Sequence, residues 1–197
     1  MKKIPTLFIR DDVDRQYVTR QVNPGCEWVI DGEGVATIKW EGTCVMLDDT
    51  ATWWARREIK PGKPTPVGFL EVDHDEVTGK RVGWEQIEQS SFHKFHAEAV
   101  KAEPPSVWGP GTYELVGPKI HRNPEGFPSH ILIRHGWAPF STRQDAQYAP
   151  REYDQLREWL HDRTNEGLVW HHPDGRMAKI KAKDFRRAAP DHQEGRP

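Results

Sequence analysis

The sequence predicts an α+β fold made mostly of antiparallel strands, and three observations lead to this prediction. Short stretches rich in β-branched and aromatic residues alternate with turn signals along most of the chain. Two longer stretches, 84–102 and 150–162, instead carry the spacing of an amphipathic helix. The 197 residues fit one domain, so we expect 1–197 to fold as a single unit with a disordered tail at 188–197.

The strands are expected to follow one another through short turns. Residues 27–47 contain two β segments around a glycine-containing turn at 31–34, and 35–40 is the second of them. A later turn is expected at 77–80, and a Pro-Asp-Gly turn at 173–175 closes the last hairpin. Further strands are expected at 52–59, 67–72, 111–120, 130–135, 166–170 and 177–185.

Two helices complete the predicted fold. The first, 84–102, ends at Glu103-Pro104-Pro105, because proline cannot continue a helix. The second, 150–162, has Pro150 near its first position, where the missing N–H costs nothing. Its apolar face, which we expect to be buried, consists of Tyr153, Leu156, Trp159 and Leu160.

Composition argues against several classes of protein. No apolar run is long enough to span a membrane, and the first residues do not resemble a signal peptide. Cys26 and Cys44 form no CxxC pair, and the histidines show no zinc-like spacing. The net charge is −2, yet residues 176–187 are strongly basic, which suits either a polyanion or a solvated edge strand. We therefore expect a cytoplasmic monomer with no membrane partner.

The run Lys39-Trp40-Glu41-Gly42 is the most informative feature of the chain. Residues two apart on a strand point to the same face, so Lys39 and Glu41 are expected to share a pocket. Gly42 allows a phosphate or the next strand to approach the backbone. An amine beside a carboxylate can attack an α-phosphate and form a phosphoramidate. Alone, the run also fits a strand-edge lysine next to a tight turn.

Three further elements strengthen the reading of Lys39 as a nucleophile. Glu114 can accept hydrogen bonds from ribose hydroxyls, and Glu41 with Glu166 can hold magnesium. Lys179 and Lys181 share a strand face and can stabilise charge on the α-phosphate. We expect these cations and burial to lower the pKa of Lys39. Alternation allows only one of Arg56 and Arg57 to face the same pocket. Singly, these residues also suit exposed strand positions.

The four elements together resemble motifs I, III, IV and V of the covalent nucleotidyltransferases, which include polynucleotide ligases and messenger-RNA capping enzymes. Other stretches resemble small ATP-dependent RNA ligases, among them a stand-alone vertebrate enzyme with bacterial and viral relatives. The resemblance covers roughly residues 27–187. These other stretches are 54–57, 60–63, 78–80, 83–84, 114–119, 123–124 and 130–136.

Two departures from the family pattern narrow the resemblance. Glu41 replaces a more common aspartate, a variation tolerated in phage-type RNA ligases. Too few residues follow Lys181 for the OB-fold that DNA ligases and capping enzymes append. The resemblance therefore favours an RNA ligase of minimal size, an ATP-grasp-like nucleotidyltransferase domain with two antiparallel sheets around the nucleotide, flanking helices and no C-terminal OB-fold.

The resemblance implies a three-step reaction that depends on ATP and on Mg²⁺ or Mn²⁺. Lys39 takes AMP from ATP, AMP passes to an RNA 5′-phosphate, and a 3′-hydroxyl displaces AMP as the ends are sealed. The nucleotide-binding set implied in this way is Ile38, Lys39, Arg56, Arg57, Glu114, Glu166, Lys179 and Lys181. An aliphatic residue of 131–133, or Trp137, is implied at the adenine face.

Two other readings remain open from the sequence. One is another covalent nucleotidyltransferase, either a DNA ligase or a messenger-RNA capping guanylyltransferase. The other is a nucleic-acid-binding relative that has lost the chemistry, although the intact Lys39 speaks against it.

Overall fold

The computed structural model describes residues 3–136 and 146–186. In this part of the chain the strands form a two-stranded sheet β1-β2, a three-stranded sheet β11-β10-β3 and a six-stranded sheet β6-β7-β5-β4-β8-β9. Neighbouring strands pair antiparallel throughout these sheets. The α+β class with mostly antiparallel strands is thus confirmed. The tail 188–197 and Trp137 lie outside the described residues.

The elements follow one another in short steps along the chain. The strands are β1 (Phe8–Arg10), β2 (Val18–Val22), β3 (Val35–Lys39), β4 (Thr43–Leu47), β5 (Trp53–Ile59), β6 (Leu70–Asp75), β7 (Lys80–Gln86), β8 (Gly111–Val116), β9 (Ile131–Arg134), β10 (Gly167–His171) and β11 (Met177–Lys181). The helices are α1 (Glu27–Ile30), α2 (His93–Lys101) and α4 (Tyr153–His161), with 3₁₀ turns at Ile87–Gln89, Pro105–Val107 and Ala182–Asp184.

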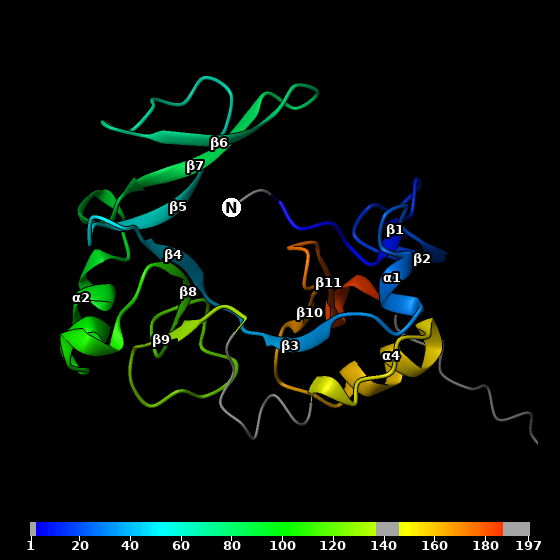
Figure 1. Cartoon of the computed structure of the whole chain (residues 1–197). Coiled ribbons are helices and arrows are strands. Elements are labelled where there is room, and N and C mark those ends of the chain that lie inside the picture. Colours follow the sequence, from blue (N-terminus) through cyan, green and yellow to red (C-terminus); the bar gives the residue numbers. More distant parts are fainter. Residues whose placement is uncertain (1–2, 137–145, 187–197) are drawn as a thin grey trace, which may run out of the picture.

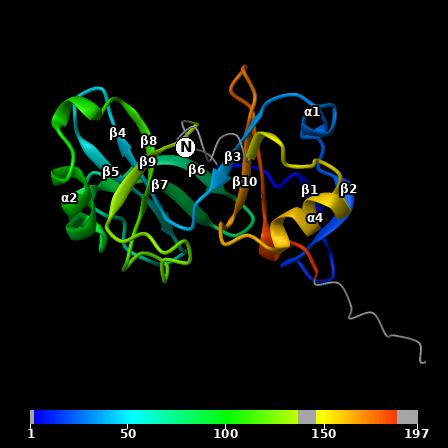
Figure 2. The same ribbon diagram turned by 90° about the horizontal axis from the view of Figure 1, so that it is seen from below.

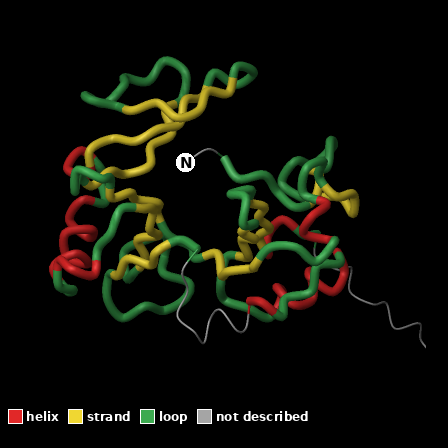
Figure 3. Tube along the Cα trace, viewed as in Figure 1, coloured by secondary structure: helices red, strands yellow, loops and turns green. Residues whose placement is uncertain are grey.

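The two larger sheets stand side by side, each with helices on its outer side (Figure 1). Figure 2 shows α2 against the six-stranded sheet at one end of the molecule and α4 with α1 at the other end. Strands occupy the middle of the molecule (Figure 3). The chain passes from the three-stranded to the six-stranded sheet between β3 and β4, through residues 40–42.

Each of these sheets buries one face in its own core. The smaller core contains Leu168, Trp170 and Ile180 from the three-stranded sheet, together with residues of β1, α1 and α4. The larger core contains Val45 and Leu115 from the six-stranded sheet, against which α2 and its neighbours pack. Because side chains alternate along a strand, the opposite faces of both sheets remain free to line a site between them.

Several predicted elements are confirmed. The helix α4 lies within the predicted 150–162, and Leu156 and Leu160 of its expected apolar face are fully buried. The last hairpin forms around residues 173–175 as predicted, with β10 and β11 in direct register. The strand β5 coincides with the predicted 52–59 apart from its first residue.

The predicted helix over 84–102 is wrong in its first half. Residues up to Gln86 extend β7, which pairs with β5 on one side and β6 on the other, and the helix begins only at His93. Trp84 lies in β7, and Ile87 lies in the 3₁₀ turn that follows the strand directly. Both side chains are buried, so their three-residue spacing resembles that of a helix.

The remaining corrections concern short segments. Residues 27–30 form one turn of helix instead of a strand, closed by the hydrogen bond from the Asp31 amide to the Glu27 carbonyl at 3.0 Å. The strands expected to end at 120 and 185 end at Val116 and Lys181, and the one expected at 67–72 is displaced to 70–75. The strands β1 and β2 were not predicted.

Within the described residues, no helix has the length and apolar character needed to cross a membrane.

Candidate functional site

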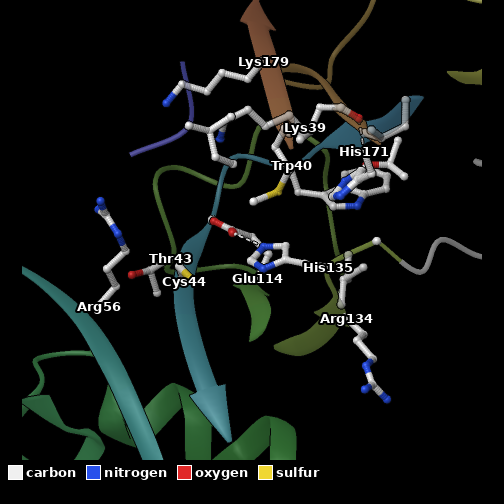
Figure 4. Close-up of a pocket in the computed structure, with 18 of the residues that line it drawn as sticks. Lys39, Trp40, Thr43, Cys44, Arg56, Glu114, Arg134, His135, His171 and Lys179 are labelled. Carbon is white, nitrogen blue, oxygen red and sulfur yellow. Dashed lines mark hydrogen bonds and ion pairs between the residues drawn. The ribbon is translucent and has the colours of Figure 1, made fainter. Parts of the chain in front are cut away.

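A pocket of about 320 Å³ lies between the free faces of the two larger sheets, and we call it the central pocket. Its walls come from β3, β10 and β11 on one side and from β4, β5, β8 and β9 on the other. Figure 4 shows Lys39 and Lys179 on one side of the pocket and Arg56, Glu114 and His135 on the other. Six segments of the chain, the N-terminal segment and five strands, thus contribute charged groups to one cavity.

Strand register explains how the basic side chains meet on the three-stranded sheet. Lys39 and Lys181 both pair with Gly167, one from each side, and directly paired residues project to the same face. Lys179 stands in the next row, paired with Val169. The residues that alternate with these on β3, β10 and β11 point to the opposite face of the sheet and belong to the smaller core. Gly167 places no side chain between Lys39 and Lys181, and a Cβ there would lie 2.0 Å from the Ile180 carbonyl oxygen.

Glu166 binds both of these lysines. One of its carboxylate oxygens contacts the Lys39 ammonium and the other contacts the Lys181 ammonium, while only 6% of its side chain is exposed. Burial by itself raises the pKa of Glu166, but the two adjacent ammonium groups outweigh it and the pKa is lowered. The carboxylate is therefore charged at neutral pH, and it holds the two lysines together despite their like charges.

The expected lowering of the Lys39 pKa is wrong. Burial lowers it, but the charges of Glu166 and Glu114 outweigh burial, so the pKa of Lys39 is raised. The pKa of Lys179 is the one that falls, to about 8, owing to burial and then to the charges of Lys181 and Lys39. The difference arises because Glu166 contacts Lys39 and Lys181 directly and does not contact Lys179.

Glu114 projects from the opposite wall of the pocket. It lies in one row of the six-stranded sheet with Cys44 and Ile133. Its carboxylate is 2.8 Å from His135 Nε2, and His135 Nδ1 is 2.9 Å from the Thr112 hydroxyl. Only 12% of the Glu114 side chain is exposed. The histidine therefore sets the orientation of the carboxylate while leaving part of it facing the pocket.

Gly42 permits the close contact between the β3–β4 connection and β8. A Cβ at this position would lie 2.6 Å from the Glu114 Cγ and 2.6 Å from the Leu115 carbonyl oxygen. The sequence left two explanations for Gly42, close approach of a phosphate or of another strand. The structure shows close approach of a strand, β8.

The two adjacent arginines of β5 have different surroundings. Arg56 lines the central pocket, and its buried Nε has no hydrogen-bond partner among the described residues. Arg57 projects from the other face, with 52% of its side chain exposed, and its Nε is 3.8 Å from Glu85. Strand alternation thus brings Arg56 to the site and excludes Arg57 from it.

Glu41 lies differently from the prediction. The strand β3 ends at Lys39, and Glu41 occupies the bend before β4, so the two residues do not share a strand face. Glu41 is not among the described residues that line the pocket, and its amide donates to Glu125 at 2.9 Å. Its charge does contribute to the raised pKa of Lys39.

The two carboxylates predicted to hold magnesium lie in different surroundings. Both oxygens of Glu166 contact lysines, and Glu41 lies outside the pocket lining. A divalent cation needs carboxylate oxygens that are free to coordinate it. Coordination by Glu166 would require at least one lysine to leave.

Sequence reasoning missed two charged or titratable residues of the pocket, His171 and Lys3. His171 Nε2 lies 3.1 Å from the Thr37 hydroxyl, and burial followed by the charge of His135 lowers the His171 pKa. His171 follows Val169 of the predicted strand by two residues, and residues two apart on a strand share a face. This spacing could have predicted that His171 lines the pocket. Lys3 also lines the pocket, and no local pattern in the sequence predicts this position. Ile38 and Ile133, both predicted near the nucleotide, line the pocket as aliphatic contacts.

The chain matches no protein-family model and no curated relative.

Residue chemistry therefore decides what the pocket can do. Cys44 is a poor nucleophile, because burial and then the Glu114 charge raise its pKa to about 12. Lys39, Lys179 and Lys181 supply positive charges from the three-stranded sheet. Arg56 and Glu114 supply a further cation and a hydrogen-bond acceptor from the six-stranded sheet across the pocket. Such a pocket suits a molecule with a polyanionic end and a hydroxyl-bearing end.

Proposed function

We propose that this protein is an ATP-dependent RNA ligase that has a covalent nucleotidyltransferase fold and forms lysyl-AMP on Lys39. The observation that supports it best is the convergence of Lys39, Glu114, Lys179 and Lys181 on one pocket between two antiparallel sheets. The order of these residues along the chain matches the motif order of the covalent nucleotidyltransferases that the sequence resembles. A nucleoside triphosphate matches the basic end and the carboxylate end of the pocket.

In the proposed first step, the neutral Lys39 amine attacks the α-phosphorus of ATP. A P–N bond forms, the bond from the α-phosphorus to the bridging oxygen breaks, and the electron pair leaves with pyrophosphate. Lys39 must first lose its proton to solvent, because the Glu166 carboxylate in contact with its ammonium stabilises the protonated form. Lys179 and Lys181 offset the negative charge that develops on the phosphate oxygens.

The other end of the nucleotide is assigned by hydrogen-bonding chemistry. Glu114, held by His135 at 2.8 Å, accepts hydrogen bonds from the ribose hydroxyls. The aliphatic Ile133 is in the same row and contacts the base. We propose that Mg²⁺ or Mn²⁺ accompanies the ATP phosphates, whose oxygens it prefers. The cation would neutralise negative charge on the phosphate oxygens.

RNA as the second substrate rests on the sequence resemblance. AMP passes from Lys39 to an RNA 5′-phosphate, and attack by a 3′-hydroxyl then seals the ends with release of AMP. A basic pocket that binds phosphates is compatible with RNA, whose recognition relies on phosphate and 2′-hydroxyl contacts.

The decisive experiment is incubation of the protein with ATP and Mg²⁺, followed by intact-mass and peptide mass spectrometry. We expect one added AMP, located on Lys39, and no adduct in Lys39→Arg. RNA carrying a 5′-phosphate should then be joined to a 3′-hydroxyl end, with and without a bridging strand. A GMP adduct from GTP would instead indicate a capping-type guanylyltransferase, and joining of DNA but not RNA would indicate a DNA ligase.

A further inference from the structure

The N-terminal segment of the described chain runs along the free edge of the three-stranded sheet. Thr6 forms a parallel bridge with Lys179 of β11. The Lys179 amide donates to the Pro5 carbonyl at 2.9 Å, and the Leu7 amide donates to the Lys179 carbonyl at 2.8 Å. Leu7 is fully buried, and its carbonyl accepts a hydrogen bond from Asn23 at 2.8 Å. Residues 5–7 are therefore hydrogen-bonded to Lys179 on one side and to Asn23 on the other.

Two residues before this anchor reach the central pocket. Lys3 and Ile4 both line it, beside Lys179. The charge of Lys3 adds to the causes that lower the Lys179 pKa, after burial and the charges of Lys181 and Lys39. The ammonium of Lys3 is thus associated with the basic end of the pocket, although Lys3 is far from the other pocket lysines in the sequence.

Lys3 also borders a second cavity of about 350 Å³, which contains Asp73 and Asp75 of β6. Among the described residues, Lys3 is the one that lines both this second cavity and the central pocket. Its charge is one of the smaller contributions to the lowered pKa of Asp75, after hydrogen bonds from Thr78. Lys3 therefore lies between the central pocket and a second cavity that both acidic and basic side chains line.

We propose that Lys3 binds the β- and γ-phosphates of ATP and assists departure of pyrophosphate from the α-phosphorus. This inference rests on the proposed function. In-line displacement places the leaving oxygen on the side of the phosphorus opposite the attacking amine. With the ribose at Glu114 and the α-phosphate at Lys39, the remaining phosphates extend away from the Lys39 amine, toward the part of the pocket that Lys3 lines.

The role of Lys3 is confined to one step of the reaction. Pyrophosphate is present only while Lys39 is being adenylylated. The later transfer of AMP to RNA and the sealing step involve AMP alone. Lys3 offsets charge on the leaving pyrophosphate in the first step and has no ligand in the other two.

The test measures nucleotide binding without turnover. In a Lys39→Met background, which cannot form the adduct, dissociation constants for ATP and AMP are compared with and without Lys3→Ala, in the presence of Mg²⁺. We expect Lys3→Ala to weaken ATP binding about tenfold, as for loss of one charge-assisted hydrogen bond, and to leave AMP binding unchanged. Lys3→Arg should retain most of the ATP affinity, because the positive charge remains.

Lys80→Ala is the matched control. Lys80 borders the second cavity with Lys3 but does not line the central pocket, and its ammonium is 3.2 Å from Glu58 in an exposed pair. We expect it to change neither affinity.

The outcomes separate the two proposals. Equal loss of ATP and AMP affinity in Lys3→Ala, or loss of neither, overturns the assignment of Lys3 while the proposed function stands. Failure of the parent Lys39→Met protein to bind either nucleotide overturns both. A second readout uses RNA that is already adenylylated at its 5′ end. Its sealing by Lys3→Ala should match the wild-type rate, and a slowed sealing step would contradict a role limited to pyrophosphate.

Discussion

The ammonium of Lys39 and the carboxylate of Glu166 form an ion pair across 127 residues of sequence, with 6% of the Glu166 side chain exposed. The pair keeps Lys39 protonated in the free protein, since the charge of Glu166 is a main cause of the raised lysine pKa. The proposed nucleophile is therefore held in position but not yet reactive.

The rate of lysyl-AMP formation should increase with pH. The pKa of Lys39 is raised above its usual 10.5, so its reactive neutral form is scarce at pH 7 and increases about tenfold per pH unit below that pKa. We expect this slope between about pH 7 and 9 in single-turnover measurements. Sealing of pre-adenylylated RNA does not use the Lys39 amine and provides the comparison. A rate of adduct formation that does not vary with pH would contradict the raised pKa.

Lys179 should be the most reactive lysine of the pocket toward an amine-modifying reagent. Its pKa is lowered to about 8, chiefly by burial and then by Lys181, so about half of it is neutral near that pH. Brief labelling at pH 8 followed by peptide mass spectrometry should modify Lys179 before Lys39. Preferential labelling of Lys39 would show that the electrostatic argument is wrong for this pair.

Replacement of Glu166 should destabilise the fold. Glu166→Ala leaves the Lys39 and Lys181 ammonium groups partly buried and facing one another without a counter-ion. Removing one partner of a buried ion pair typically costs about 3 to 5 kcal/mol of unfolding free energy, and partial exposure of the lysines favours the lower end. Urea denaturation measures the change. Glu58→Ala, which breaks the exposed pair with Lys80, should cost less than about 1 kcal/mol.

Gly167→Ala should damage both stability and the lysine row. A Cβ there would lie 2.0 Å from the Ile180 carbonyl oxygen and 2.7 Å from the Lys181 Cα, so β10 and β11 would have to separate. We expect a loss of about 3 kcal/mol, at the upper end for overpacking, seen as a lower melting temperature. Gly109→Ala, whose Cβ would meet its nearest atom at 3.5 Å in Arg134, should leave the melting temperature nearly unchanged.

The two adjacent arginines of β5 should differ in their effect on ATP binding. Arg56 lines the central pocket with an unpartnered Nε, so Arg56→Ala removes a charged donor available to phosphate. We expect the ATP dissociation constant to rise about tenfold or more. Arg57→Ala, which removes a half-exposed side chain on the opposite face, should leave it unchanged. Equal effects of both substitutions would place the nucleotide elsewhere.

Features that depend on spacing within one strand were predictable from the chain alone. A two-residue interval was enough to place Lys179 and Lys181 on one face, and adjacency was enough to separate Arg56 from Arg57. The last hairpin followed from its Pro-Asp-Gly turn. The same reasoning failed for Glu41, because β3 ends at Lys39 and the alternation does not continue through the bend.

The boundary between β7 and α2 was not predictable in this way. Trp84 and Ile87 have helical spacing, but β5 and β6 lie on either side of β7 and satisfy its backbone hydrogen bonds as a strand. Tertiary pairing therefore overrides a local pattern that fits either element.

Composition and local periodicity were sufficient for the α+β class and for a short set of candidate residues, because alternation is a property of each segment. The folded chain alone settled which arginine enters the pocket, which lysine has the lowered pKa and that Lys3 borders the site. These outcomes depend on distances between segments that are remote in sequence. Electrostatic energy depends on those distances and on burial, and the order of residues along the chain records neither.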